Sequence, residues 1–299
     1  MTQRMTQHLL PHPVTGQLFP SPVPQGTGWP GDPASAQTPV ATTGPDVLRL
    51  ADSIDDVGEL CGAMSVCRAC PRLVEWREDV ADVKRASFAD QPYWGRPIAG
   101  WGEEHPAVLI IGLAPAANGG NRTGRIFTGD RSGDWLFASL HRVGLAVEER
   151  SDHAGDGQRL VGTRMVATVR CAPPDNKPTV QERDTCAPWL LKEISLVSDS
   201  VRAIVCLGLY GWDATLRTVR SMGYDVSRPK PKFGHGAETV ITSPTGRKVT
   251  VLGSYHPSQQ NTFTGKLTEP MLDAVLGRAA LLGAPVEDAV EDSVEDWAP

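Results

Sequence analysis

The feature that most constrains the fold of this chain is the alternation of short apolar runs with segments of helical periodicity. Four runs are rich in β-branched residues and end in turn residues, which is typical of buried parallel strands. They are AVLIIGLAP from Ala107, MVATVR from Met165, RAIVCLGLYG from Arg202 and KVTVLGSYHPS from Lys248. The helical segments are SGDWLFASLHRVGL from Ser132, ERDTCAPWLLKEISLV from Glu182, which Pro188 interrupts early, and TEPMLDAVLGRAALLG from Thr268. The alternation predicts a three-layer α/β/α sandwich with a central, mainly parallel four-stranded sheet.

The two ends of the chain differ from its body. Residues 1–45 are rich in Pro, Gly, Thr and Gln without an apolar period, which predicts a flexible N-terminal arm. Residues 46–284 are expected to form the folded domain, and residues 285–299 a solvated acidic tail. Without the six acids of that tail, the remaining Asp and Glu equal the 29 Lys and Arg. The net charge of −6 therefore does not exclude a local basic face.

No stretch is apolar for long enough to span a membrane, and no apolar signal core precedes the first prolines, so we expect a cytoplasmic protein. Thiols stay reduced in that compartment, so six cysteines favour metal binding or catalysis over disulfides. Cys61 lies on a predicted helix and Cys206 inside a predicted strand, as expected of ordinary buried thiols.

Four cysteines remain as candidate ligands. Cys67 and Cys70 form the pair in CRAC, while Cys171 and Cys186 are predicted to lie in a loop, with fourteen residues between them. Four thiolates can hold zinc or a [4Fe–4S] cluster. One CxxC with two dispersed cysteines favours the iron–sulfur cluster, but the spacing alone does not decide, and chance placement stays open.

Three polar segments follow predicted strands, where α/β sheets place their ligands. GLAPAANGGNRTGRIFTGDRSGDW follows the first strand, VRCAPPDNKPTVQERDTC the second and GSYHPSQQNTFTGK the fourth. Backbone N–H groups of the Gly-rich loop can bind a phosphate or a developing anion, but the loop lacks the lysine of a P-loop. Phe127 is expected to be exposed beside Asp130, and His256 to lie in a loop at a strand end.

Together these segments resemble the uracil-DNA glycosylase superfamily, and within it the family 5, or B-type, iron–sulfur enzymes. The residues that carry the resemblance are CRAC (67–70), GLAPAANGGNRTGRIFTGD (112–130), VRCAPPDN (169–176), Cys186 and GSYHPSQQNTFTG (253–265). The resemblance implies a structural [4Fe–4S] cluster held by Cys67, Cys70, Cys171 and Cys186. It also implies that residues 46–284 form a glycosylase domain.

By this resemblance the chain is a monofunctional DNA N-glycosylase that flips a damaged base out of the duplex. Phe127 would stack on the base, and Asn176 would read its edge and help to position water. His256 would donate a hydrogen bond to the leaving base, and a carboxylate would stabilise the cationic sugar. We assign the carboxylate to Asp130, with Asp134 as the fallback. The expected base contacts are Gly112, Ala114, Phe127, Asn176 and His256.

The first motif of strict uracil enzymes carries a bulky tyrosine, whereas here Ala116 or Ala117 would leave room. The resemblance therefore implies a broader range of substrate bases. The expected substrates are uracil and either hypoxanthine or etheno-cytosine in damaged double-stranded DNA, bound by a monomer. The expected backbone contacts are Asn121, Arg122, Arg125, Ser254 and Ser258, with Arg170, Lys177 and Lys266 as further candidates. Relatives often place a leucine wedge after HPS, but this chain has Gln259, Gln260 and Asn261 there.

Two alternatives remain open from the sequence. A non-catalytic iron–sulfur or zinc module that binds DNA lesions would share the cysteines but would not need Asp130 or His256. A hydrolase of free nucleotides could use the same Gly-rich loop, but it should require a metal and more acidic ligands than these loops offer.

Overall fold

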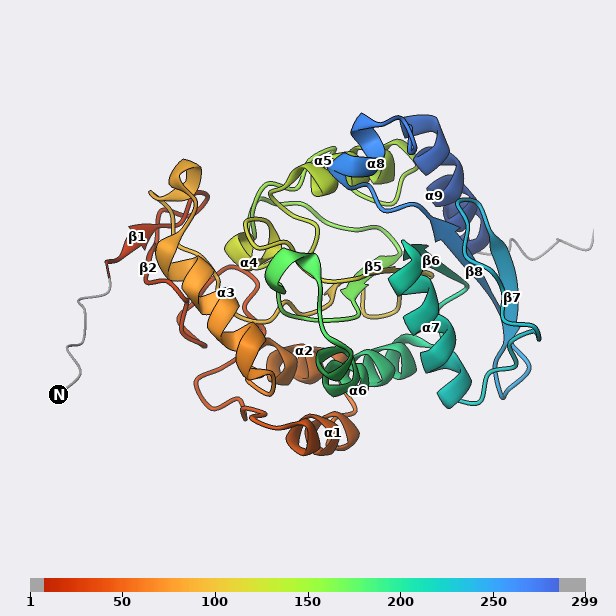
Figure 1. Ribbon diagram of the computed structural model, residues 1–299, viewed down its shortest axis with the longest axis horizontal. Coiled ribbons are helices and arrows are strands. Elements are labelled where there is room, and N and C mark those ends of the chain that lie inside the picture. Colours follow the sequence, from red (N-terminus) through yellow and green to blue (C-terminus); the bar gives the residue numbers. More distant parts are fainter. Residues whose placement is uncertain (1–7, 285–299) are drawn as a thin grey trace, which may run out of the picture.

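The computed structural model describes residues 8–284 and contains one central six-stranded sheet (Figure 1). The strand order is β3-β5-β4-β6-β8-β7. The four predicted strands form its parallel centre: β4 (Val108–Gly112), β5 (Thr163–Ala167), β6 (Ala203–Leu207) and β8 (Lys248–Ser254). The antiparallel edges β3 (Trp101–Gly102) and β7 (Glu238–Thr242) were not predicted. The sandwich is therefore confirmed, with two edge strands added to the predicted four.

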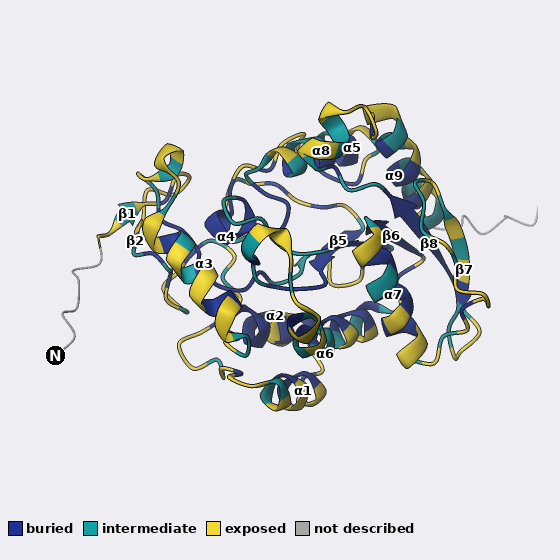
Figure 2. Cartoon of the chain, viewed as in Figure 1, coloured by how far each residue is buried: buried dark blue, intermediate teal, exposed yellow. Residues whose placement is uncertain are grey.

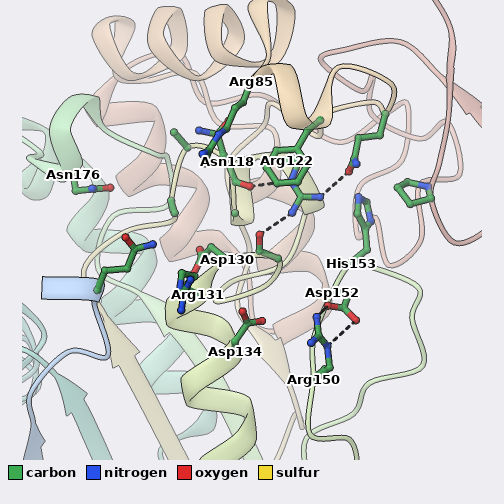
Figure 3. Close-up of a pocket in the computed structure, with 18 of the residues that line it drawn as sticks. Arg85, Asn118, Arg122, Asp130, Arg131, Asp134, Arg150, Asp152, His153 and Asn176 are labelled. Atoms are coloured by element: carbon green, nitrogen blue, oxygen red, sulfur yellow. Dashed lines mark hydrogen bonds and ion pairs between the residues drawn. The ribbon is translucent and has the colours of Figure 1, made fainter. Parts of the chain in front are cut away.

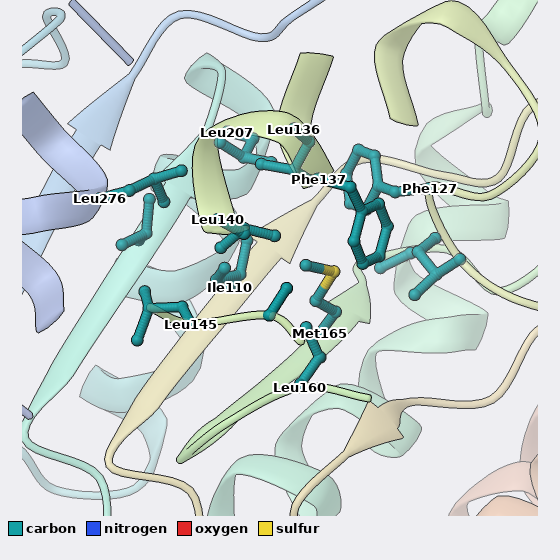
Figure 4. Packing of buried hydrophobic residues seen from close by; sticks show 14 of the residues in the cluster. Ile110, Phe127, Leu136, Phe137, Leu140, Leu145, Leu160, Met165, Leu207 and Leu276 are labelled. Carbon is teal, nitrogen blue, oxygen red and sulfur yellow. The ribbon is translucent and has the colours of Figure 1, made fainter. Parts of the chain in front are cut away.

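Helices cover both faces of the sheet because its strands alternate apolar side chains between two cores. On one face, α5 (Arg131–Arg142) and α9 (Glu269–Gly283) pack over side chains such as Ile110 and Met165 (Figure 4). On the other, α6 (Val180–Val197) and α7 (Leu209–Ser221) pack over Leu109 and Ile111. Helix α6 continues through Pro188, so the predicted interruption is wrong.

The remaining elements surround this sandwich and are mostly short. Helices α1 (Gly44–Ser53) and α2 (Val57–Ser65) pack on α6, and α3 (Pro71–Val83) follows the CRAC segment. Figure 2 shows that α3 presents a broad exposed face. The short elements are β1 (Leu10–Pro11), β2 (Leu18–Phe19), η1 (Ala86–Phe88), α4 (Gly120–Thr123), η2 (Pro174–Asn176) and α8 (Gln259–Phe263).

Residues 8–45 are not a flexible arm, which corrects the prediction for the part of that arm that the structure describes. Phe19, Val23 and Trp29 are each at most 2% exposed and belong to the core shared with α5. Arg96 donates from both terminal nitrogens to the Asp32 carboxylate, at 2.8 and 3.0 Å. The segment is held by scattered buried side chains and a buried ion pair. Residues 1–7 and the predicted acidic tail lie outside the described residues.

If the Asp32–Arg96 pair fixes this segment, Asp32→Ala should lower the free energy of unfolding by roughly 3–5 kcal/mol, because it leaves a buried guanidinium unpaired. Urea unfolding of the full chain measures this. The matched control is Asp55→Ala, since Asp55 pairs with Lys192 but is 92% exposed, and it should change stability by less than about 0.5 kcal/mol. Equal effects of the two substitutions would contradict the assignment.

Candidate active site

The carboxyl ends of β4, β5 and β8 direct three loops to one edge of the sheet, where they enclose a pocket of about 530 Å³. All three predicted catalytic residues, Asp130, Asn176 and His256, line this pocket. The predicted base contacts Ala114 and Phe127 line it as well. Residues that are distant in the sequence therefore meet in one cavity, as expected for the end of a parallel sheet.

Asp130 begins helix α5 as its N-cap. Its Oδ1 accepts hydrogen bonds from the backbone N–H groups of Ser132 and Gly133, at 2.9 and 3.0 Å. Burial raises the pKa of Asp130, and the two amide hydrogen bonds oppose that shift. A Cβ at Gly119 would lie 2.1 Å from Oδ2 of Asp130, so glycine leaves room for this carboxylate. Asp134, the fallback, lies on α5 and borders only the wider groove beyond the pocket.

Phe127 forms the aromatic wall of the pocket. It is only 7% exposed, so the expectation of an exposed ring is wrong. A Cβ at Gly112 would lie 2.6 Å from Cζ of the ring, and the absence of that Cβ makes room for Phe127. Gly112 thus lies directly against the Phe127 ring. The backbone of Phe127 is left-handed, with φ of 51°, which is a strained conformation for an aromatic residue.

His256 follows β8 in a loop, as predicted, and its ring centroid lies 5.9 Å from that of Phe127. Burial lowers the pKa of His256 to about 4, so the imidazole is neutral at neutral pH. Asn261 Nδ2 donates to the His256 carbonyl at 2.8 Å and fixes the loop. Asn176 is exposed and left-handed, with φ of 55°, and its amide faces the pocket from the second loop.

The predicted backbone contacts are mostly buried. Asn121 donates to the Arg77 carbonyl, Ser254 to the Tyr255 carbonyl, and Arg125 pairs with Asp156 at 2.6 Å. The buried side chains are Asn121, Arg122, Arg125 and Ser254, together with the further candidate Arg170. These side chains brace the loops from inside the protein, and of them only Arg122 also borders the groove beside the pocket. Ser258 does line the pocket.

A groove of about 970 Å³ joins the pocket at Asp130 and runs toward η1 (Figure 3). Its border includes four side chains to which sequence reasoning assigned no role: Arg85, Asn118, Arg131 and Phe263. Phe263 is 65% exposed, and the Arg131 guanidinium lies 5.0 Å from its ring centroid. Asn118 and Phe263 stand inside the recognised motifs, whereas nothing near Arg85 in the sequence signals a groove.

The four candidate cysteine ligands line one cavity, which shares no residue with the pocket described above. Cys186 lies on α6, which corrects its predicted place in a loop. Arg77 is 1% exposed and donates from Nη1 to Cys171 Sγ at 2.9 Å. Arg170 lines the same cavity, and its buried Nε and Nη1 have no acceptor among the described residues. Burial raises the pKa of the Cys67, Cys70 and Cys186 thiols.

Comparison with known proteins now identifies the family. The family model described as "Uracil DNA glycosylase superfamily" matches residues 99–279, which contain the pocket. The chain belongs to the uracil-DNA glycosylase superfamily. The resemblance inferred from the motifs is confirmed, and so is the expectation of a hydrolytic DNA N-glycosylase.

Several similar proteins carry the name "Type-5 uracil-DNA glycosylase". That of Mycobacterium bovis is 57% identical over 271 residues, covering 91% of this chain and 98% of the relative. Those of Thermus thermophilus and Pyrobaculum aerophilum are 45% and 41% identical, covering 73% and 72% of this chain and 94% and 88% of their own lengths. In residues 8–284, no helix is both long and apolar enough to cross a membrane.

Asp130 caps α5, and its carboxylate is also the predicted catalytic group, so the two roles can be tested separately. Asp130→Asn keeps a capping oxygen and removes the charge, so the melting temperature should stay equal or rise while single-turnover base release falls at least about 100-fold. Asp130→Ala should also lose roughly 1 kcal/mol of stability. Base release by Asp130→Asn at the wild-type rate would contradict the catalytic role.

Proposed function

We propose that the protein removes uracil from double-stranded DNA by hydrolysis, leaving an abasic site, and that it also accepts hypoxanthine or etheno-cytosine. The observation that carries the proposal is the convergence of Asp130, Asn176 and His256 in one pocket beside the Phe127 ring. A base inside a duplex cannot reach such a pocket, so the nucleotide must rotate out of the stack.

Each side chain has a defined task in this reaction. The flipped base stacks on Phe127, while the Asn176 amide offers a donor and an acceptor to its polar edge. As the N-glycosidic bond breaks, the neutral imidazole of His256 donates a hydrogen bond to the base oxygen that gains negative charge. The buried Asp130 carboxylate stabilises the positive charge on the sugar and orients the attacking water.

The wider substrate range rests on the size of the side chains in the first motif. Ala114 and Ala116 line the pocket, whereas Ala117 lies on the groove. Methyl side chains at these positions do not fill the pocket. Bases larger than uracil therefore fit beside Phe127.

The deciding experiment is uracil release from a labelled duplex with uracil opposite guanine, without added metal and with alkali to cleave abasic sites. Wild type should release uracil, and His256→Ala should be slower by roughly 100-fold, as for loss of one charge-stabilising donor. Parallel duplexes with hypoxanthine or etheno-cytosine test the wider range. A protein that binds these duplexes but releases no base would instead be the lesion-binding module.

We also propose that Cys67, Cys70, Cys171 and Cys186 hold a structural [4Fe–4S] cluster. The support is a cavity lined by four thiols, a buried guanidinium donating to Cys171, and buried N–H groups of Arg170 that lack acceptors. N–H donors beside the sulfur ligands are a common feature of such centres. In residues 8–284, no three His, Cys, Asp or Glu side chains are arranged to hold a single metal ion. The cluster would hold the loop that follows β5 against α6 and the CRAC segment.

The cofactor proposal predicts four irons and four sulfides per chain, with visible absorption, in protein purified without oxygen. Cys171→Ala should lose the iron and lower the melting temperature, because the ligand set loses one thiolate. Cys206→Ala is the matched control, since Cys206 is a buried thiol in β6, and it should keep full iron content. One zinc per chain without iron would contradict the cluster.

Flipping leaves a gap in the duplex, and we propose that Phe263, which is 65% exposed at the border of the groove, fills it. Because stacking on an aromatic ring contributes roughly 1–3 kcal/mol per base, Phe263→Ala should reduce uracil release about 10- to 100-fold. A pyrene nucleotide opposite the uracil should restore it by filling the gap. Tyr210→Ala is the matched control, because Tyr210 is 54% exposed beside Arg183 but lies away from the groove. If a pyrene nucleotide does not restore uracil release by Phe263→Ala, this role is contradicted.

A further inference from the structure

A buried tyrosine links two polar residues at the border of the groove. The hydroxyl of Tyr93, a residue with 0% exposure, donates to Oδ1 of Asn118 at 2.9 Å. The same hydroxyl accepts a hydrogen bond from the backbone N–H of Arg85 at 3.4 Å. Burial raises the pKa of Tyr93, so the phenol stays protonated and remains a donor. This chain of hydrogen bonds has a fixed direction.

The direction of the chain sets the orientation of the Asn118 amide. Because Oδ1 accepts from Tyr93, the amide NH₂ group is directed away from the tyrosine. The main chain of Asn118 is fixed as well, since Arg122 Nε donates to its carbonyl at 2.9 Å. Arg122 is itself held by Gln91 and by the Gly129 carbonyl, each at 2.7 Å. The amide is therefore preorganised before any ligand arrives.

Arg85 and Asn118 both line the groove that leads to Asp130, and Figure 3 shows them side by side. An exposed guanidinium beside oriented amide N–H groups makes a site for an anion. Of the carboxylates that border the groove, Asp152 pairs with Arg150 at 2.8 Å and Asp130 caps α5.

We propose that Asn118 and Arg85 bind one phosphodiester of the damaged strand, and that Tyr93 is the positioning residue that keeps the Asn118 amide turned toward it. The inference rests on the proposed function, since it requires duplex DNA in the groove. Asn118 belongs to the same loop as Asp130. Binding a phosphate there therefore sets the position of the sugar relative to the carboxylate.

The test is a binding experiment with duplexes that carry a non-hydrolysable uracil nucleotide. Phosphates on either side of it are replaced one at a time by neutral methylphosphonates. Wild type should lose affinity about tenfold at one particular phosphate, as expected for a charge-assisted contact. Asn118→Ala and Arg85→Ala should each bind the unmodified duplex several-fold to tenfold more weakly. Both variants should be much less sensitive than wild type to that one replacement, and as sensitive as wild type to the others.

Tyr93→Phe tests the positioning role, because it removes only the hydroxyl. It should weaken binding to the unmodified duplex several-fold, and this effect should vanish in the Asn118→Ala background. The control is Arg217→Ala, because Arg217 lies on α7 and its side chain is 69% exposed. This variant should keep both the affinity and the methylphosphonate sensitivity of wild type.

Two results would overturn the site. One is equal sensitivity of wild type, Asn118→Ala and Arg85→Ala to every methylphosphonate. The other is a Tyr93→Phe defect that persists in the Asn118→Ala background, which would make Tyr93 merely structural. Uracil release by wild type from the unmodified duplex is measured in parallel. If wild type releases uracil but the variants show the same methylphosphonate sensitivity as wild type, only this phosphate site is refuted. If wild type releases no uracil, the proposed function itself is refuted.

Discussion

The site depends on the two amide hydrogen bonds that hold Asp130 at the start of α5. They fix one carboxylate oxygen and leave the other beside Gly119, where only a glycine gives it room. Gly133 is constrained in the same turn, because a Cβ there would lie 2.1 Å from the Phe127 carbonyl oxygen. The helix start thus positions the carboxylate and the aromatic wall together. A charge that is costly to bury is retained where the proposed chemistry requires it.

The basic residues of the first motif illustrate how such a loop is kept rigid. Arg122 and Arg125 would be obvious contacts for a polyanion, yet their guanidinium groups bond to carbonyls and to Asp156 inside the protein. Burying them lowers the pKa of both, an electrostatic cost that these contacts offset. The loop is therefore ordered before DNA binds. In the proposed complex, contact with the DNA backbone falls to side chains on the groove that come from other parts of the chain, such as Arg85.

Much of the fold could be predicted from the sequence, because periodicity reports local structure and α/β sheets place their ligand loops at the carboxyl ends of the strands. The four central strands, α5, α9 and the position of His256 were predicted on that basis. Residues 8–45 were not, since Phe19 and Trp29 are isolated among prolines and glycines and become buried only through long-range contacts such as Asp32–Arg96. The edge strand β3 has only two residues, too few to show a periodic pattern of apolar side chains. The burial of Arg122 was missed because arginine is usually exposed, and only the fold shows which carbonyls surround it.

The measurement that tests the central claim most directly is the pH dependence of single-turnover uracil release by wild type and by Asp130→Asn. Burial raises the pKa of Asp130 above its ordinary value of 3.8, and in the proposed mechanism the ionised form is the active one. The wild-type rate should therefore fall as the pH drops through that raised pKa, with a slope of one proton. The residual rate of Asp130→Asn should lack this acid limb. An acid limb that persists unchanged in Asp130→Asn would show that another group carries the catalytic charge.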